Sequence, residues 1–80
     1  MLIFDNFDSL ESAQKFAAHV RSRFRKEATV CETREQFDKL DLFPFELVTP
    51  IVAVERDDIA VVEQSIEDTV EEFGGQFAGT

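Results

Sequence analysis

Few side chains in this sequence are of a kind that performs chemistry. The chain has one histidine, His19, and one cysteine, Cys31. A hydrolase or a transferase needs a base beside a nucleophile, and no such pair is apparent. His19 lies beside the apolar face of a predicted helix, which favours a boundary histidine. Cys31 precedes Glu32, and a nearby anion raises the pKa of a thiol, so a catalytic thiolate is not expected. We therefore predict that the chain is not an enzyme.

A small acidic cluster, formed by Glu55, Asp57 and Asp58, precedes the second long predicted helix. Carboxylate oxygens are ligands for Mg²⁺ and Ca²⁺, but the ligand order and the glycine of a calcium loop are missing. Capping of the helix and favourable charge at its N-terminus account for the cluster more simply. The tail GGQFAG contains glycines but lacks the lysine of a phosphate-binding loop. We predict no metal site and no cofactor.

Four strands are expected to position these groups. The apolar runs at 1–4 and 51–54 predict strands that are buried on both faces. The roughly alternating stretch 28–33 is flanked by glutamates, which is typical of an edge strand. The tail from Gln76 onward predicts a short last strand.

Two amphipathic stretches predict the long helices. The first is expected to begin at Asp8, in a capping-box pattern, and to end near Arg25. Its apolar positions recur at steps of three and four, and they are Leu10, Ala13, Ala17, Val20 and Phe24. The second is expected to be capped by Asp57 or Asp58 and to end at Gly74. Its apolar seam consists of Ile59, Val62, Ile66, Val70 and Phe73.

The order of these elements is that of a ferredoxin-like βαββαβ fold. We therefore predict one α+β domain over residues 1–80. Its four-stranded antiparallel sheet has the order 4-1-3-2, which makes the two apolar strands central, and both long helices lie on one face. A short helix and a loop are expected between the second and third strands, because Thr33 and Gln36 match a capping box.

The loop DLFPFELVTP, at 41–50, is unusually apolar. The side chains on both faces of the two central strands are apolar as well. The sheet face opposite the helices therefore needs a cover. Phe43, Phe45 and Leu47 could provide this cover within one chain, or they could frame a contact between two copies stacked sheet on sheet. The sequence leaves these two alternatives open. The loop is therefore predicted to cover its own sheet, to take part in self-association, or to offer its apolar surface to a partner.

The charge pattern is the other informative feature. The formal net charge of −9 disfavours direct binding to nucleic acid and to an anionic membrane surface. The cations of the first helix are Lys15, Arg21, Arg23, Arg25 and Lys26. The acidic residues of the second helix are Glu63, Glu67, Asp68, Glu71 and Glu72. Because the two helices are expected to lie side by side, these charges either pair with one another or support head-to-tail association or a basic partner.

The stretches DLFPFELVTPIVAVER and EEFGGQFAGT resemble small, acidic, uncharacterised proteins encoded by bacteriophages of actinobacteria. The resemblance spans most of the chain and contains no functional motif. It implies an accessory role, such as binding a host protein during infection. The single cysteine and the absence of a signal peptide or a long apolar run predict a cytoplasmic protein.

These observations predict a non-enzymatic protein-interaction module that self-associates, most simply as a homodimer. A basic host protein is the other expected partner. One alternative is a small-molecule-sensing regulatory domain, although the acidic stretch VERDD after the third strand argues against an anionic metabolite. Another alternative is an acidic decoy that occupies a DNA-binding protein.

Overall fold

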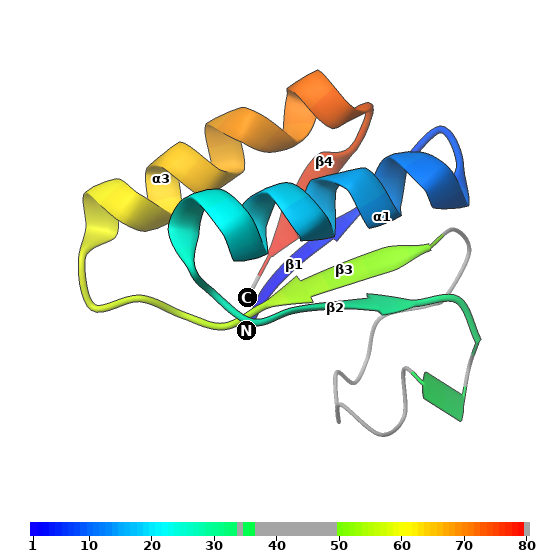
Figure 1. Ribbon diagram of the computed structural model, residues 1–80, viewed down its shortest axis with the longest axis horizontal. Coiled ribbons are helices and arrows are strands. Elements are labelled where there is room, and N and C mark those ends of the chain that lie inside the picture. The colour runs from blue at the N-terminus through cyan, green and yellow to red at the C-terminus, as the bar shows by residue number, and fades with distance from the viewer. Residues whose placement is uncertain (34, 37–49, 80) are drawn as a thin grey trace.

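The helices and the strands form two layers in the computed structural model, which describes residues 1–33, 35–36 and 50–79 (Figure 1). The sheet consists of β1 (Leu2–Asp5), β2 (Ala28–Cys31), β3 (Ile51–Val54) and β4 (Gln76–Gly79). Its order is β2-β3-β1-β4, and all neighbouring strands are antiparallel. Read from the other edge, this is the predicted order, with the apolar strands β1 and β3 in the centre.

The first helix, α1 (Leu10–His19), begins one residue later than predicted. Its N-cap residue is Ser9, whose Oγ accepts a hydrogen bond from the backbone N–H of Ser12 at 3.1 Å. The prediction of Asp8 as the cap is therefore wrong. The short hydroxyl side chain of Ser9 reaches the helix from an extended backbone, whereas the carboxylate of Asp8 lies against Gly74 at the far end of the other helix.

A π-helical turn, η1 (Val20–Phe24), continues α1 and ends at Arg25. The predicted end near Arg25 is confirmed. Arg25 has a φ of 56°, so it provides the left-handed C-cap without being a glycine. The π turn itself was not predicted, because the spacing of Val20 and Phe24 is equally compatible with an ordinary α-helical turn.

The second helix, α3 (Ala60–Thr69), runs antiparallel to α1 and continues into a 3-10 turn, η2 (Val70–Phe73) (Figure 1). It ends at Gly74, as predicted, with a φ of 76°. Its predicted cap is wrong, because the N-cap residue is Ile59 and no side chain caps it. The Oδ1 atom of Asp57 instead accepts a hydrogen bond from the backbone N–H of Ile59 at 2.7 Å, ahead of the helix.

The main core lies between the helices and the sheet. Phe4 and Phe16 are its largest buried side chains, and their rings contact edge to face with centroids 5.0 Å apart. Val20 and Ile66 are fully buried there, as predicted, whereas Phe73 is only partly buried against the cluster. Most of the predicted seam of each helix therefore faces this core, but Ile59 is 57% exposed, so its place in the second seam was predicted wrongly.

The other face of the sheet carries a second, smaller cluster of buried residues. Ile3, Cys31, Ile51 and Ala53 are at most 1% exposed, and Ala78 packs against them. The expectation that this face is shielded from solvent is therefore met. Both α1 and α3 lie on the opposite face (Figure 1). The loop that was predicted to provide the cover, residues 41–50, lies outside the described residues except for Pro50.

The start of the predicted short helix is present after β2. The Oε1 atom of Gln36 accepts a hydrogen bond from the backbone N–H of Thr33 at 3.2 Å, and the Oγ1 atom of Thr33 accepts one from the backbone N–H of Gln36 at 3.2 Å. This reciprocal pair is the predicted capping box. The remainder of that predicted helix lies outside the described residues. None of the helices in the described ranges is long and apolar enough to cross a membrane.

Candidate functional site

Three arginines stand where the first helix ends and the edge strand β2 begins. Arg21 and Arg23 belong to η1, and Arg25 is the residue that caps it. Only Lys26 and Glu27 separate Arg25 from β2. We refer to Arg21, Arg23 and Arg25 as the cationic cluster. The short connection holds this cluster near the start of the edge strand.

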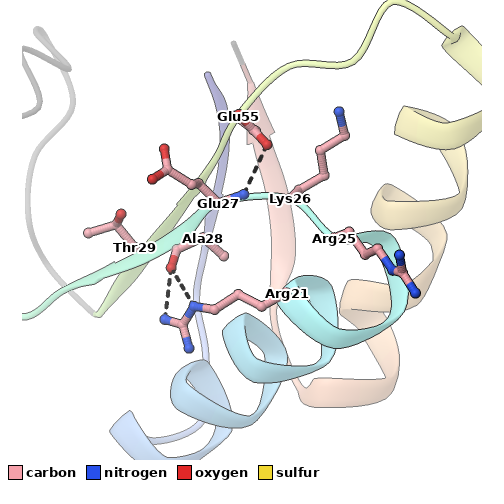
Figure 2. A pocket seen from close by; sticks show the side chains of 7 residues that line it. All are labelled: Arg21, Arg25, Lys26, Glu27, Ala28, Thr29 and Glu55. Atoms are coloured by element: carbon pink, nitrogen blue, oxygen red, sulfur yellow. Dashed lines mark hydrogen bonds between the residues drawn. The ribbon is translucent and has the colours of Figure 1, made fainter.

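Arg21 is fixed against the main chain of β2. Its Nε and Nη2 atoms both donate hydrogen bonds to the carbonyl oxygen of Ala28, at 3.0 and 2.8 Å (Figure 2). This carbonyl lies on the edge of the sheet, where none of the described strands pairs with it. A guanidinium has five N–H donors, so further donors of Arg21 are left for another acceptor.

Lys26, in contrast, has a carboxylate partner. Its Nζ atom lies 2.5 Å from Oδ2 of Asp57. The hydrogen bond between them raises the pKa of Lys26 and lowers the pKa of Asp57. The hydrogen bond that Asp57 accepts from Ile59 further lowers the pKa of Asp57. This ion pair therefore ties the turn before β2 to the start of α3.

A hollow of about 380 Å³ lies between η1 and the start of β2 (Figure 2). It is lined by Arg21, Arg25, Lys26, Glu27, Ala28, Thr29 and Glu55. In Figure 2 the charged ends of Arg21, Arg25 and Lys26 point away from one another. Because a small-molecule site needs a few convergent polar groups, this arrangement does not suit a compact anion.

A second hollow, of about 490 Å³, lies between α1 and β2. It is lined by Gln14, Arg21, Ala28, Thr29, Val30 and Glu32. The two hollows share Arg21, Ala28 and Thr29, so together they follow the outer edge of β2. A concave surface along an edge strand suits an added extended segment.

The cationic cluster has no carboxylate partner within the described part of the chain. The ion pairs found there join Lys15 to Glu11, Lys26 to Asp57 and Arg56 to Glu63. None of them links α1 or η1 to the acidic residues near the end of α3. The pairing of the two helices across a shared rim, one of the two sequence alternatives, is therefore not observed among these residues.

The acidic residues of α3 and η2 separate into two groups. Glu63 is only 12% exposed at its side chain, and its Oε2 atom lies 2.8 Å from Nε of Arg56. The hydrogen bond from Arg56 lowers the pKa of Glu63. Glu63 is therefore an internal partner rather than part of a binding surface, which corrects the sequence prediction.

The other four acidic residues, which we call the acidic surface, lie toward the end of the helix. They are Glu67, Asp68, Glu71 and Glu72. Asp68 accepts a hydrogen bond from Gln64 at 3.0 Å, and none of the four has a cationic partner among the described ion pairs. Since α1 and α3 run in opposite directions, this surface and the cationic cluster lie at opposite ends of the helix layer (Figure 1).

The one histidine and the one cysteine of the chain both pack against other side chains of the fold. His19 is partly exposed, and its ring lies 5.2 Å from that of Phe73 and 6.1 Å from that of Phe24. Cys31 is fully buried, and its pKa is raised by this burial rather than by Glu32 as predicted. In the described ranges, no three residues among His, Cys, Asp and Glu are grouped so as to hold a metal ion.

The predicted interaction residues of the loop, Phe43, Phe45 and Leu47, lie outside the described residues, so their role stays a prediction. The contact of Arg21 with β2 was not predicted from the sequence. The crowding of cations at the end of the first helix was visible in the sequence. The helix dipole alone favours cations at a helix C-terminus, so their presence did not indicate a contact with the strand.

Comparisons of the chain with protein-family models, with curated proteins and with solved structures find no match.

Proposed function

We propose that this chain is a non-enzymatic protein-interaction module that associates with a second copy of itself. The observation that carries the proposal is the cationic cluster, Arg21, Arg23 and Arg25, which has no carboxylate partner in the described ranges although the chain has a net charge of −9. In such a chain, carboxylates are abundant, and arginines are well suited to pairing with them at interfaces. A second copy supplies these carboxylates.

We further infer that the domain is ferredoxin-like. The strand order β2-β3-β1-β4, the antiparallel pairing, and a helix after each central strand support this assignment. Domains of this size have a small core, and self-association would add to their buried surface. The loop residues Phe43, Phe45 and Leu47 remain candidates for a contribution to that surface.

A second candidate function is the binding of a basic protein by the acidic surface. The grouping of Glu67, Asp68, Glu71 and Glu72, none of which forms an ion pair within the described residues, favours it. This role agrees with the proposed accessory function of a phage protein that binds a host protein, and with that of a decoy for a DNA-binding protein. A small-molecule-sensing role has less support, because the charged groups around the hollow in Figure 2 diverge.

Sedimentation velocity over a wide range of concentrations tests the self-association. We expect the mean sedimentation coefficient to rise with concentration from that of a monomer to that of a dimer. A single monomeric species at all concentrations would show that the chain does not associate with itself. The binding of a basic protein by the acidic surface would then be the remaining proposal.

A further inference from the structure

The outer edge of β2 carries main-chain groups that face away from the sheet. The backbone N–H of Glu55 donates to the carbonyl oxygen of Glu27 at 3.0 Å, so Glu27 faces β3. Because this direction alternates along an antiparallel strand, Thr29 also faces β3, whereas Ala28 and Val30 turn their N–H and C=O groups outward. The contact of Arg21 with the carbonyl of Ala28 agrees with this direction.

We propose that β2 pairs antiparallel with β2 of a second copy about a two-fold axis at Thr29, which joins the two sheets into one. The inference rests on the proposed self-association and names its surface. In this register, Thr29 stands opposite Thr29 of the second copy, and Ala28 stands opposite its Val30. The outward N–H and C=O groups of Ala28 and Val30 then form hydrogen bonds between the copies.

In the proposed register, the charges along this strand are complementary to those of the same strand in the second copy. In the sequence KEATVCE, at 26–32, Lys26 and Glu32 are equally distant from Thr29. A two-fold axis at Thr29 therefore places Lys26 of each copy opposite Glu32 of the other. Glu32 is exposed, and its carboxylate has no ion pair among the described residues, so it is available for this contact. Lys26 already pairs with Asp57 of its own chain, so it adds a favourable opposite charge across the strands while the carboxylate of Glu32 stays available to Arg21.

The hollow between α1 and β2 provides space for the side chain of Glu32 from the second copy. Arg21 and Val30 line this hollow, which has a volume of about 490 Å³. In the proposed register, Glu32 of the second copy is the diagonal neighbour of Ala28, on the side of the sheet that the helices cover. Arg21, which is held over Ala28, can therefore pair with this carboxylate.

Arg21 has a different role in the single copy. Its guanidinium covers the carbonyl of Ala28, and a charged side chain over an edge strand discourages indiscriminate strand pairing. In the dimer, the N–H of Val30 from the second copy donates a hydrogen bond to this carbonyl, in place of Arg21 or together with it. Arg21 then has a carboxylate partner in place of a neutral acceptor, and this exchange favours a copy of the same chain over an arbitrary strand.

A second copy fits this edge better than an acidic peptide. Glu27 and Glu32 are exposed beside the outer edge of β2, and Glu55 lines the adjacent hollow. These carboxylates repel a uniformly acidic segment, whereas the strand itself carries both signs in the order that its own two-fold pairing requires. The charge complementarity therefore selects the second copy as the occupant.

A cysteine cross-link tests the register directly. Opposed residues that do not exchange hydrogen bonds have Cα atoms about 4.5 Å apart, which a disulfide can span. We expect Thr29→Cys to form a covalent dimer under mild oxidation. Ser65→Cys, an exposed position on α3, is the matched control and should form no covalent dimer under the same conditions, as should the parent chain with its buried Cys31. No cross-link at Thr29→Cys in a chain that dimerises would overturn the proposed register.

A charge reversal tests the same surface without a covalent bond. Glu32→Lys places lysine opposite Lys26 at both ends of the paired strands, and we expect it to raise the dimer dissociation constant at least about tenfold. Glu72→Lys makes the same change of charge on the acidic surface and is the control. Sedimentation measures both.

The outcomes separate the two proposals. A parent chain that stays monomeric overturns both the self-association and its surface. A parent chain that dimerises, with Glu32→Lys no weaker than Glu72→Lys and no cross-link at Thr29→Cys, overturns only the β2 pairing and leaves the self-association standing.

Discussion

Replacement of Phe16 by alanine is expected to lower the free energy of unfolding by about 3–5 kcal/mol. Phe16 is fully buried, and its ring contacts those of Phe4, Phe7 and Phe73 at centroid distances of 5.0, 5.6 and 5.8 Å. It therefore connects α1 to β1, to the segment that follows β1, and to η2. A domain of 80 residues has a stability of only about 4–12 kcal/mol, so this variant should be partly or wholly unfolded.

Phe77→Ala is the matched control for this experiment. Phe77 loses a ring of the same size, but it is 37% exposed, and among the described residues its ring contacts only that of Phe4, at 5.5 Å. We expect less than half of the effect of Phe16→Ala, because less apolar surface is returned to water and little cavity remains. Chemical denaturation of both variants measures the difference. Equal losses would show that Phe16 is not the centre of the core.

Ala53→Asp is expected to destabilise the chain by about 3–5 kcal/mol at neutral pH. Ala53 is fully buried on the sheet face opposite the helices, beside Ile3, Cys31 and Ile51. A carboxylate placed there would lose its water, and the described residues of this cluster include no cation to pair with it. The result tests whether this second face is as well shielded as the first.

The pH dependence of the Ala53→Asp variant has a defined sign. Burial raises the pKa of the new carboxyl in the folded state above its unfolded value of about 3.9. The penalty is therefore smallest below the unfolded pKa, and it grows as the pH rises through the folded pKa. Thr29→Asp, measured at concentrations where the chain is monomeric so that its place in the proposed dimer has no effect, is the control, since Thr29 pairs with Ala53 across the strands but is exposed. It should change stability by no more than about 0.5 kcal/mol, and equal effects would contradict the shielding of Ala53.

The strands and their places in the sheet could be predicted because buried strands consist of apolar residues, which are visible in the sequence. Runs of apolar residues at 1–4 and 51–54 require contact on both faces, and only central strands have it. The end of the second helix, where η2 stops, was equally predictable, because the left-handed conformation at Gly74 favours glycine. In both cases one physical requirement restricts the residue types strongly.

The helix starts were predicted less well, because several residues compete for each cap. Asp8 and Ser9 are both good N-cap residues, and the backbone conformation decides between them. Before α3, Asp57 is occupied by Lys26 from the turn before β2. That ion pair joins residues distant in sequence, so local patterns did not reveal it.

The candidate surface was only partly predictable for the same reason. The sequence showed a basic helix and an acidic helix, but it did not show that Glu63 pairs with Arg56 or that Arg21 reaches the carbonyl of Ala28. The second of these contacts depends on the π turn and on the left-handed Arg25, which together set the path from α1 into β2. The edge of β2 became a candidate surface only when these positions were known.

Amide hydrogen exchange at Ala28 and Val30, measured at concentrations above and below the dissociation constant of the dimer, tests the central claim most directly. Their N–H groups face outward in the single copy, so they should exchange rapidly when dilute and become protected as the chain dimerises. The N–H of Thr29, which faces β3, should be protected throughout. Exchange at Ala28 and Val30 that stays rapid at concentrations where the chain is dimeric would contradict the pairing of β2 with a second copy.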